Sequence, residues 1–331
     1  MNLRQLGTTG LQVSPIGLGL AALGRPGYIN LEHAADLEGN YDEAAMQAHT
    51  HQVLDAAWQA GVRYFDAARS YGKAEEFLGS WLSSRKIPGV EVTVGSKWGY
   101  AYTAGWQVEA EQHEVKEHSL SVLQRQWRES QANLGAYLRL YQVHSATLNS
   151  GIFENQDVLQ ELGRLKSAGI YIGLTLSGPA QAQTLERALE ITVGGARLFD
   201  SVQATWNLLE PSAGPALQRA HRQGMGIIIK EALANGRLTG RNTDPAFAAK
   251  LAILEAQAGR LDTSIDALAL AAVLNQPWVD VVLSGAARIA HLHSNLQALH
   301  VRWDEEAETS LAALPENPHG YWETRRSLEW N

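Results

Sequence analysis

Eight short apolar runs, separated by longer segments with a helical hydrophobic period, restrict the fold of this 331-residue sequence more than any other feature. The runs occupy residues 14–20, 62–65, 91–95, 138–143, 171–174, 201–204, 225–229 and 279–283. Strands that are apolar throughout and alternate with helices indicate a parallel sheet that is covered by those helices. No linker rich in proline, glycine or serine divides the sequence, so we expect one α/β domain over residues 1–331, closed as a (β/α)8 TIM barrel.

The segments between the runs have the pattern of amphipathic helices. In the clearest of them, residues 73–82, apolar residues recur at spacings of three and four and form one stripe. Further helices are expected at residues 155–166, 179–191, 212–222 and 290–299. Three glycines stand between an expected helix and the next strand, where a left-handed residue ends many helices: Gly61, Gly169 and Gly224.

A doubly wound sheet is the alternative α/β architecture. Its dinucleotide-binding fingerprint, GxGxxG directly after the first strand, does not fit the sequence GLGLAALG at residues 17–24. The barrel is therefore the better interpretation. In a barrel the loops that follow the strands converge at one face, so we expect the functional residues at the carboxyl ends of the apolar runs.

Composition argues against several classes of partner and site. A net charge of −8 and the absence of a lysine- or arginine-rich run argue against nucleic acid. The sequence has no cysteine, which excludes disulfides and thiolate metal sites. Its first residues lack a secretory signal pattern, and no apolar stretch reaches the roughly 18–20 residues that a membrane span needs. We therefore expect a cytoplasmic protein without a membrane partner.

Four ionisable residues stand at the ends of three consecutive apolar runs. Asp66 and Tyr71 follow the second run, Lys97 follows the third, and His144 follows the fourth. Each alone has an ordinary structural explanation, such as a helix cap or a packed ring. Together they suit proton transfer at a carbonyl, since an ammonium beside a phenol lowers the phenol pKa and an adjacent carboxylate keeps that ammonium charged. We expect His144 to hydrogen-bond the substrate oxygen.

These segments resemble the aldo-keto reductase family. The resemblance begins with RQLGTTGLQVSPIGLGLAALG at residues 4–24, which is similar to the opening hairpin and first strand of the family. It continues through GVRYFDAARSYGKAEEFLG (61–79), VGSKWGY (94–100), LYQVHSA (140–146), FDSVQATWNLLEP (199–211) and SGAARIAHLHSNLQAL (284–299). The family reduces aldehydes or ketones, or oxidises alcohols, with a nicotinamide cofactor. The resemblance thus implies an amino-terminal β-hairpin before the barrel and long loops at its carboxyl face.

The resemblance also assigns roles by position. It makes Tyr71 the general acid, tuned by Lys97 and Asp66, with His144 orienting the carbonyl. Gln203 matches the residue that hydrogen-bonds the nicotinamide carboxamide. The stretch that matches the adenosine-binding part of the family contributes Gly285, Arg288 and Asn295.

Two cofactor positions depart from the family pattern. Thr175 and Leu176 stand where Ser-Asn is common, so only Thr175 retains a hydroxyl for the carboxamide. Lys230 stands where a stacked aromatic ring is common, and its ammonium is a candidate partner for the cofactor diphosphate. Arg288 is the one evident cation near the expected 2'-phosphate, which favours NADPH and leaves NADH as the alternative.

Substrate selection is expected from three segments with many aromatic residues or unusual length. They are residues 25–47, read as a long loop, residues 98–114, and residues 319–331. We expect a small-molecule carbonyl or alcohol substrate, either an apolar or aromatic carbonyl or a flat polyol. No charged anchor for an acidic substrate is apparent, and the sequence does not determine an oligomeric state.

Other functions remain open at this point. A Schiff-base aldolase would use the same barrel with Lys97 or Lys230 as the nucleophile. A non-catalytic regulatory subunit that binds the cofactor is a further alternative. Metal-assisted hydrolysis is weaker, because the pairs His49/His51 and His291/His293 are spaced by two on expected helices and diverge, so no metal ligand is expected.

Overall fold

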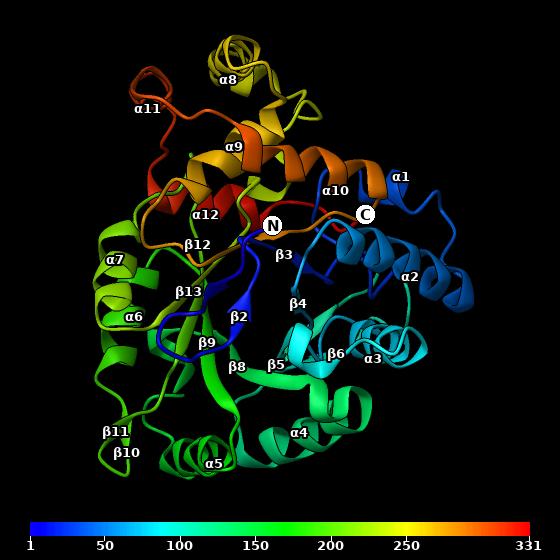
Figure 1. Ribbon diagram of the computed structural model, residues 1–331, viewed down its shortest axis with the longest axis vertical. Helices are drawn as coiled ribbons and strands as arrows, with labels where there is room; N and C mark the ends of the chain where they lie inside the picture. The colour runs from blue at the N-terminus through cyan, green and yellow to red at the C-terminus, as the bar shows by residue number, and fades with distance from the viewer.

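The computed structural model describes residues 1–331 and contains a closed barrel of eight parallel strands in chain order (Figure 1). The strands are β3 (Ile16–Gly19), β4 (Tyr64–Asp66), β5 (Thr93–Trp98), β8 (Leu138–Ala146), β9 (Tyr171–Leu176), β12 (Ser201–Thr205), β13 (Gly226–Lys230) and β14 (Val281–Ser284). Pairing of β14 with β3 closes the ring. The predicted (β/α)8 barrel is confirmed, and each of the eight apolar runs supplies one strand.

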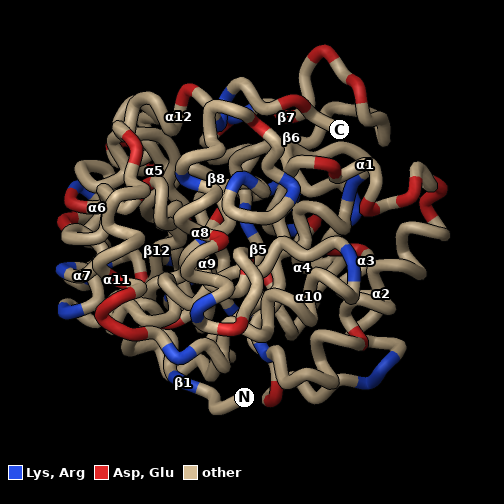
Figure 2. Tube along the Cα trace, turned by 90° about the horizontal axis from the view of Figure 1, so that it is seen from above, with Lys and Arg blue, Asp and Glu red and all other residues tan.

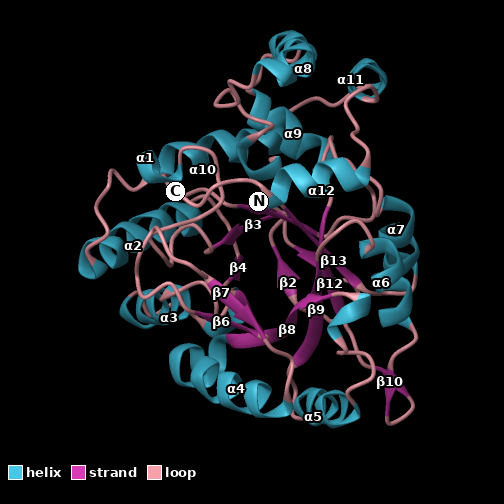
Figure 3. Ribbon diagram, turned by 180° about the vertical axis from the view of Figure 1, so that it is seen from behind, coloured by secondary structure: helices cyan, strands magenta, loops and turns pink.

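Helices surround the strands on the outside of the barrel (Figure 3). Those between barrel strands are α1 (His33–Asp36), α2 (Glu43–Gln59), α3 (Ala74–Ser84), α4 (Leu120–Leu134), α5 (Gln156–Ser167), α6 (Gln181–Leu189), α7 (Gly214–Arg222), α8 (Ala248–Arg260) and α9 (Ile265–Leu274). After β14 follow α10 (Ile289–Leu296), α11 (Glu305–Leu311) and α12 (Pro318–Arg326). None of the helices combines the length and the apolar character needed to cross a bilayer.

Several helices differ from the sequence interpretation. Residues 43–47, read as part of a long loop, form the first turn of α2, where the Asp42 side chain caps the Ala45 N–H. Helix α9 was not predicted, because residues 267–273 are all buried and therefore show no polar face. Gly61, Gly169 and Gly224 do follow helices in the left-handed conformation, with φ of 92°, 93° and 81°. The five helices expected from the hydrophobic period are present as α3, α5, α6, α7 and α10.

A short hairpin closes the amino end of the barrel. Strand β1 (Arg4–Gln5) pairs with β2 (Gln12–Val13), as the resemblance implied. Leu6 and Val13 are fully buried there, in one apolar cluster with side chains from β4, β8, β13 and β14. The turn requires Gly7, since a Cβ at this position would lie 2.4 Å from the backbone nitrogen of Gly226. This end of the barrel is filled by side chains.

The opposite end is the mouth of the barrel. Figure 2 shows β1 and the amino terminus on one side of the molecule and β6, β7 and the carboxyl terminus on the other. Strands β6 (Tyr100–Tyr102) and β7 (Glu114–Lys116) form an antiparallel hairpin in the loop after β5. Asn331 exchanges two backbone hydrogen bonds of 3.1 Å with Tyr28. The last residues therefore lie against the loop that follows β3.

A third hairpin, β10 (Thr192–Val193) and β11 (Ala196–Arg197), precedes β12.

Candidate active site

Asp66, the last residue of β4, is the centre of a buried hydrogen-bond network. Its Oδ1 accepts hydrogen bonds from the Tyr64 hydroxyl (3.1 Å), Gln142 Nε2 (3.2 Å) and Gln203 Nε2 (3.1 Å). Its Oδ2 accepts from the Lys97 ammonium. These donors come from β4, β8, β12 and β5, so four strands of the barrel fix the position of the carboxylate.

Lys97 lies on β5 and is fully buried. Besides its ion pair with Asp66, the ammonium donates to the Ala67 carbonyl oxygen at 2.8 Å. Its Nζ lies 4.6 Å from the centroid of the Tyr71 ring. Burial lowers the pKa of Lys97, and the charge of Asp66 opposes that shift. The ion pair expected from the sequence is present directly beneath the phenol.

Tyr71 and His144 face each other above this pair. Their rings meet edge to face with centroids 5.5 Å apart. Tyr100 packs on the other side of the imidazole at 5.0 Å, and Ser70 Oγ lies 3.5 Å from its Nδ1. Burial, reinforced by the charges of Lys97 and Lys230, holds the pKa of His144 well below its ordinary value. The imidazole is therefore neutral at pH 7.

The pKa of Tyr71 differs from the sequence interpretation. Burial raises this pKa well above its ordinary value, the charge of Asp66 raises it further, and Arg25 lowers it. We expected Lys97 to lower the pKa of the phenol. The main physical reason for the difference is burial of the phenol, which disfavours the charged phenolate, and the nearby charge of Asp66 adds to this effect. The phenol consequently stays protonated at pH 7 and is available as a proton donor.

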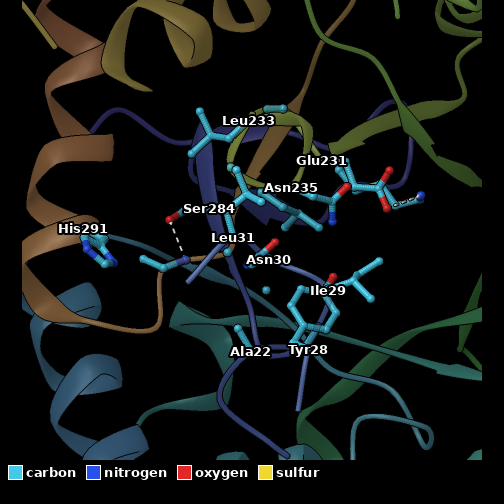
Figure 4. A pocket seen from close by; sticks show the side chains of 18 of the residues that line it. Ala22, Tyr28, Ile29, Asn30, Leu31, Glu231, Leu233, Asn235, Ser284 and His291 are labelled. Carbon is cyan, nitrogen blue, oxygen red and sulfur yellow. Dashed lines mark hydrogen bonds and ion pairs between the residues drawn. The ribbon is translucent and has the colours of Figure 1, made fainter. Parts of the chain in front are cut away.

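A cavity of about 490 Å³ opens above these residues. At its inner end the lining includes Asp66, Tyr71, His144 and Gln203, and Lys97 lies just below it. The cavity continues past Glu231 and Asn235 to Ser284 and His291, which lie at the far side (Figure 4). Tyr28, Asn30 and Leu31, from the loop after β3, also lie among the residues that line the cavity (Figure 4). The cavity is elongated and joins the four ionisable residues to the end of β14.

Four of the six predicted cofactor residues line this cavity, namely Gln203, Lys230, Gly285 and Asn295. The other two lie outside the lining. Thr175 is fully buried, and its hydroxyl donates to Ser145 Oγ at 3.3 Å, so Ser145 lines the wall in its place. Arg288 points away and pairs with Glu38 at 2.8 Å. Arg241 is the arginine that lines the outer end of the cavity.

Lys230, the last residue of β13, is a largely buried cation in the lining. Its ammonium donates to Thr205 Oγ1 at 2.9 Å and lies 3.6 Å from Glu231 Oε1. Burial lowers the pKa of Lys230 to about 8. Burial opposes ionisation of Glu231 as well, but the charges of Arg325 and Lys230 hold its pKa at about 2. Glu231 also accepts hydrogen bonds from Arg325 at 2.6 and 3.1 Å.

The charged residues of the cavity that the sequence interpretation did not identify include Arg25, Glu231 and Arg325. Arg25 is 2% exposed, pairs with Glu114, and lies 5.2 Å from the Tyr71 ring centroid. Arg325 reaches Glu231 from α12, 94 residues away in the chain. No local pattern signals ion pairs between such distant segments.

The lining fits an elongated dinucleotide. A Cβ added at Gly285 would meet no protein atom within 4 Å, so this backbone borders open cavity space. Asn235 Oδ1 is buried in the wall without a hydrogen-bond partner. Gln203, Asn295 and Arg241 add polar side chains along the length of the cavity. The chain brings together no group of three side chains suited to a metal ion.

The sequence matches the family model described as the aldo/keto reductase family over residues 15–315. This chain belongs to that family. It is 24% identical to the uncharacterized oxidoreductase YqkF of Bacillus subtilis over 330 residues, covering 93% of this chain and 94% of the relative. It is 22% identical to norsolorinic acid reductase of Aspergillus flavus over 314 residues, covering 90% and 77%.

Solved structures agree with the fold of this aldo/keto reductase. The holo form of aldo-keto reductase AKR11C1 from Bacillus halodurans superimposes with a TM-score of 0.72 at 21% identity, covering 96% of this chain and 99% of that one. Membership of the family makes this protein an NAD(P)H-dependent oxidoreductase that acts on carbonyl compounds. The suspected resemblance is confirmed over nearly the whole chain.

Proposed function

We propose that this protein reduces a small-molecule aldehyde or ketone, or oxidises the corresponding alcohol, with Tyr71 as the general acid and His144 as the residue that orients the carbonyl. One observation supports this most strongly. A protonated phenol and a neutral imidazole face the same cavity, directly above the buried Lys97–Asp66 pair. A carbonyl oxygen between the two rings would accept a hydrogen bond from each.

In this proposal the cofactor, Tyr71, Lys97 and Asp66 each have one role in the reduction. The bound dinucleotide supplies the hydride. Tyr71 gives its hydroxyl proton to the substrate oxygen as negative charge develops there. The Lys97 ammonium, 4.6 Å from the ring centroid, stabilises the phenolate that is left. Asp66 keeps Lys97 charged and in place through an ion pair that four strands support.

We assign the cofactor to the elongated cavity. Gln203 is proposed to bind the nicotinamide carboxamide at the inner end, and Gly285 and Asn295 the adenosine at the outer end. Thr175 stays a weaker prediction, because its hydroxyl is buried against Ser145. We favour NADPH over NADH, since Arg241 lines the outer end of the cavity, where it also pairs with Asp36. Arg288, the cation expected for the 2'-phosphate, is not part of the lining and pairs with Glu38.

The test is the Tyr71→Phe variant, assayed with aldehydes, ketones and sugars at the nicotinamide absorbance band with NADPH and NADH in parallel. We expect kcat to fall by about 10³-fold or more, because no other proton donor replaces the phenol. Cofactor affinity, measured by quenching of tryptophan fluorescence, should change little. Tyr137→Phe is the matched control, since that hydroxyl donates to the Ile87 carbonyl outside the cavity. Wild-type turnover by Tyr71→Phe would refute the assignment.

A Schiff-base aldolase is the second candidate, and one observation favours it. Lys230 lines the cavity with a pKa lowered to about 8, which leaves part of its amine neutral at pH 7. Trapping of a carbonyl substrate on Lys230 by borohydride, without nicotinamide, would support that function. We rank it lower, because nothing near Lys230 matches the paired Tyr71 and His144.

A further inference from the structure

The cations at the inner end of the cavity outnumber the carboxylates. Three cations have a carboxylate of their own, in the pairs Lys97–Asp66, Arg25–Glu114 and Arg325–Glu231. Lys230 is the fourth cation, and it has no carboxylate that pairs with it alone. It shares Glu231 at 3.6 Å, while Arg325 holds the same carboxylate through two hydrogen bonds. Among these groups one positive charge is therefore left over, and it belongs to a side chain that lines the cavity. The remaining charged residues of the lining are Arg241, which pairs with Asp36, and Asp266.

The Lys230 ammonium also has unused hydrogen-bond donors. It carries three N–H groups, of which one donates to Thr205 Oγ1. Only 16% of the side chain is exposed, so bulk water is a limited substitute for a partner. A buried charge that is incompletely paired is costly, and an anionic ligand in the cavity would complete its pairing.

Strand geometry places this charge close to the reacting groups. Gln142 on β8 and Gln203 on β12 both point to Asp66. Side chains two residues apart on a regular strand share a face, so Thr205 points into the mouth one step above Gln203. Strand β8 is irregular between Val143 and Ala146, and His144 is placed at the mouth by its position in the cavity lining. Thr205 is the register partner of Lys230 and its hydrogen-bond acceptor. Lys230 and His144 both line the cavity, and the charge of Lys230 contributes to the lowered pKa of His144, so the two side chains lie near each other at the mouth.

We propose that the substrate is an oxo acid, an aldehyde or ketone that also carries a carboxylate, and that Lys230 binds this carboxylate while the carbonyl lies at Tyr71 and His144. The inference rests on the proposed carbonyl reduction and names its substrate class. An anion on the cofactor has Arg241 as another candidate partner at the outer end of the cavity, where this arginine also pairs with Asp36. The structure thus provides the charged anchor that the sequence did not reveal.

The test compares acids with matched neutral compounds. The probes are 4-formylbenzoate and unbranched ω-oxo acids, each beside its methyl ester, with NADPH as reductant. For the wild-type protein we expect kcat/KM for at least one acid to exceed that for its ester by about 10- to 100-fold, the range of a charge-assisted hydrogen bond. The Lys230→Met variant should bring that ratio close to one, and Lys230→Arg should retain most of it. Lys116→Met is the control, because this lysine lies over the Tyr100 ring but outside the cavity lining, and it should leave the ratio unchanged.

The other possible results distinguish failure of the oxo-acid inference from failure of the proposed carbonyl reduction. Equal turnover of acids and esters by the wild-type protein would overturn the oxo-acid inference and leave carbonyl reduction standing. A weaker NADPH affinity in Lys230→Met with an unchanged acid-to-ester ratio would assign Lys230 to the cofactor and also overturn it. If no carbonyl compound is reduced, the proposed function fails. Tryptophan fluorescence then still reports whether 4-formylbenzoate binds, and whether Lys230→Met weakens that binding as the inference requires.

Discussion

Lys97 and Lys230 both lie at the carboxyl end of the barrel, but their surroundings differ. Lys97 is fully buried on β5 beside Asp66, a carboxylate that it shares with no other cation. Lys230 is the last residue of β13 and has only a share of Glu231, which Arg325 already holds. The comparison indicates that a fully paired cation is a fixed part of the site, whereas an incompletely paired one is available to a ligand.

The comparison predicts opposite effects on stability when each lysine is removed. Lys97→Met leaves Asp66 buried without its cation, so we expect the free energy of unfolding to fall by about 3–5 kcal/mol. Urea denaturation followed by tryptophan fluorescence measures this change. A loss below about 1 kcal/mol would mean that the hydrogen bonds from Tyr64, Gln142 and Gln203 suffice to hold the carboxylate.

Lys230→Met should instead stabilise the protein at pH 7, by about 1–3 kcal/mol, because it removes a buried charge and leaves Glu231 paired with Arg325. The difference depends on pH. The pKa of Lys230 is about 8 in the folded protein and 10.5 as its ordinary value, so between these the unfolded chain binds more protons and wild-type stability rises with pH.

The advantage of Lys230→Met should therefore shrink from pH 8 to pH 10.5. The groups that face this ammonium are Glu231, Arg325 and Lys97, together with His144, and all of them remain in the variant. Urea denaturation of both proteins across this range measures the difference. A constant difference would contradict the depressed pKa of Lys230.

The preference for oxo acids should follow the same ionisation. Above pH 8 the Lys230 ammonium loses its proton, so the ratio of kcat/KM for an acid over its ester should fall by up to about tenfold per pH unit. Below pH 8 the ratio should be constant. Initial rates with 4-formylbenzoate and its methyl ester between pH 6 and pH 10 measure it, and taking the ratio removes ionisations that affect both substrates. An acid-to-ester ratio of kcat/KM that does not change with pH would show that Lys230 does not select the substrate.

Much of the fold was predictable because the barrel strands are apolar runs and ionisable residues stand at the ends of three of them. Each of the eight apolar runs supplies a barrel strand, and the position of Asp66, Lys97 and His144 at strand ends was enough to expect them around one mouth. Helix α9 could not be predicted in the same way, since it is buried on all sides and has no amphipathic period.

Charge balance was the part of the site that could not be predicted. The sequence identified the ammonium beside Tyr71, but the pKa of the phenol depends first on its burial and then on the charges around it, and burial together with Asp66 reverses the expected direction. The pairs Arg25–Glu114 and Arg325–Glu231 join segments 89 and 94 residues apart. Only the three-dimensional arrangement shows that Lys230 has no carboxylate of its own and shares Glu231 with Arg325.

The most direct test of the account is the fate of deuterium from NADPH that carries deuterium at both hydrogen positions on C4 of the nicotinamide. The protein is mixed with labelled NADPH and an aldehyde that it turns over, and the product is examined by mass spectrometry. We predict an alcohol with one deuterium on the former carbonyl carbon, formed by the wild-type protein and not by Tyr71→Phe. An unlabelled product, or a product formed equally well by Tyr71→Phe, would contradict hydride transfer with Tyr71 as the proton donor.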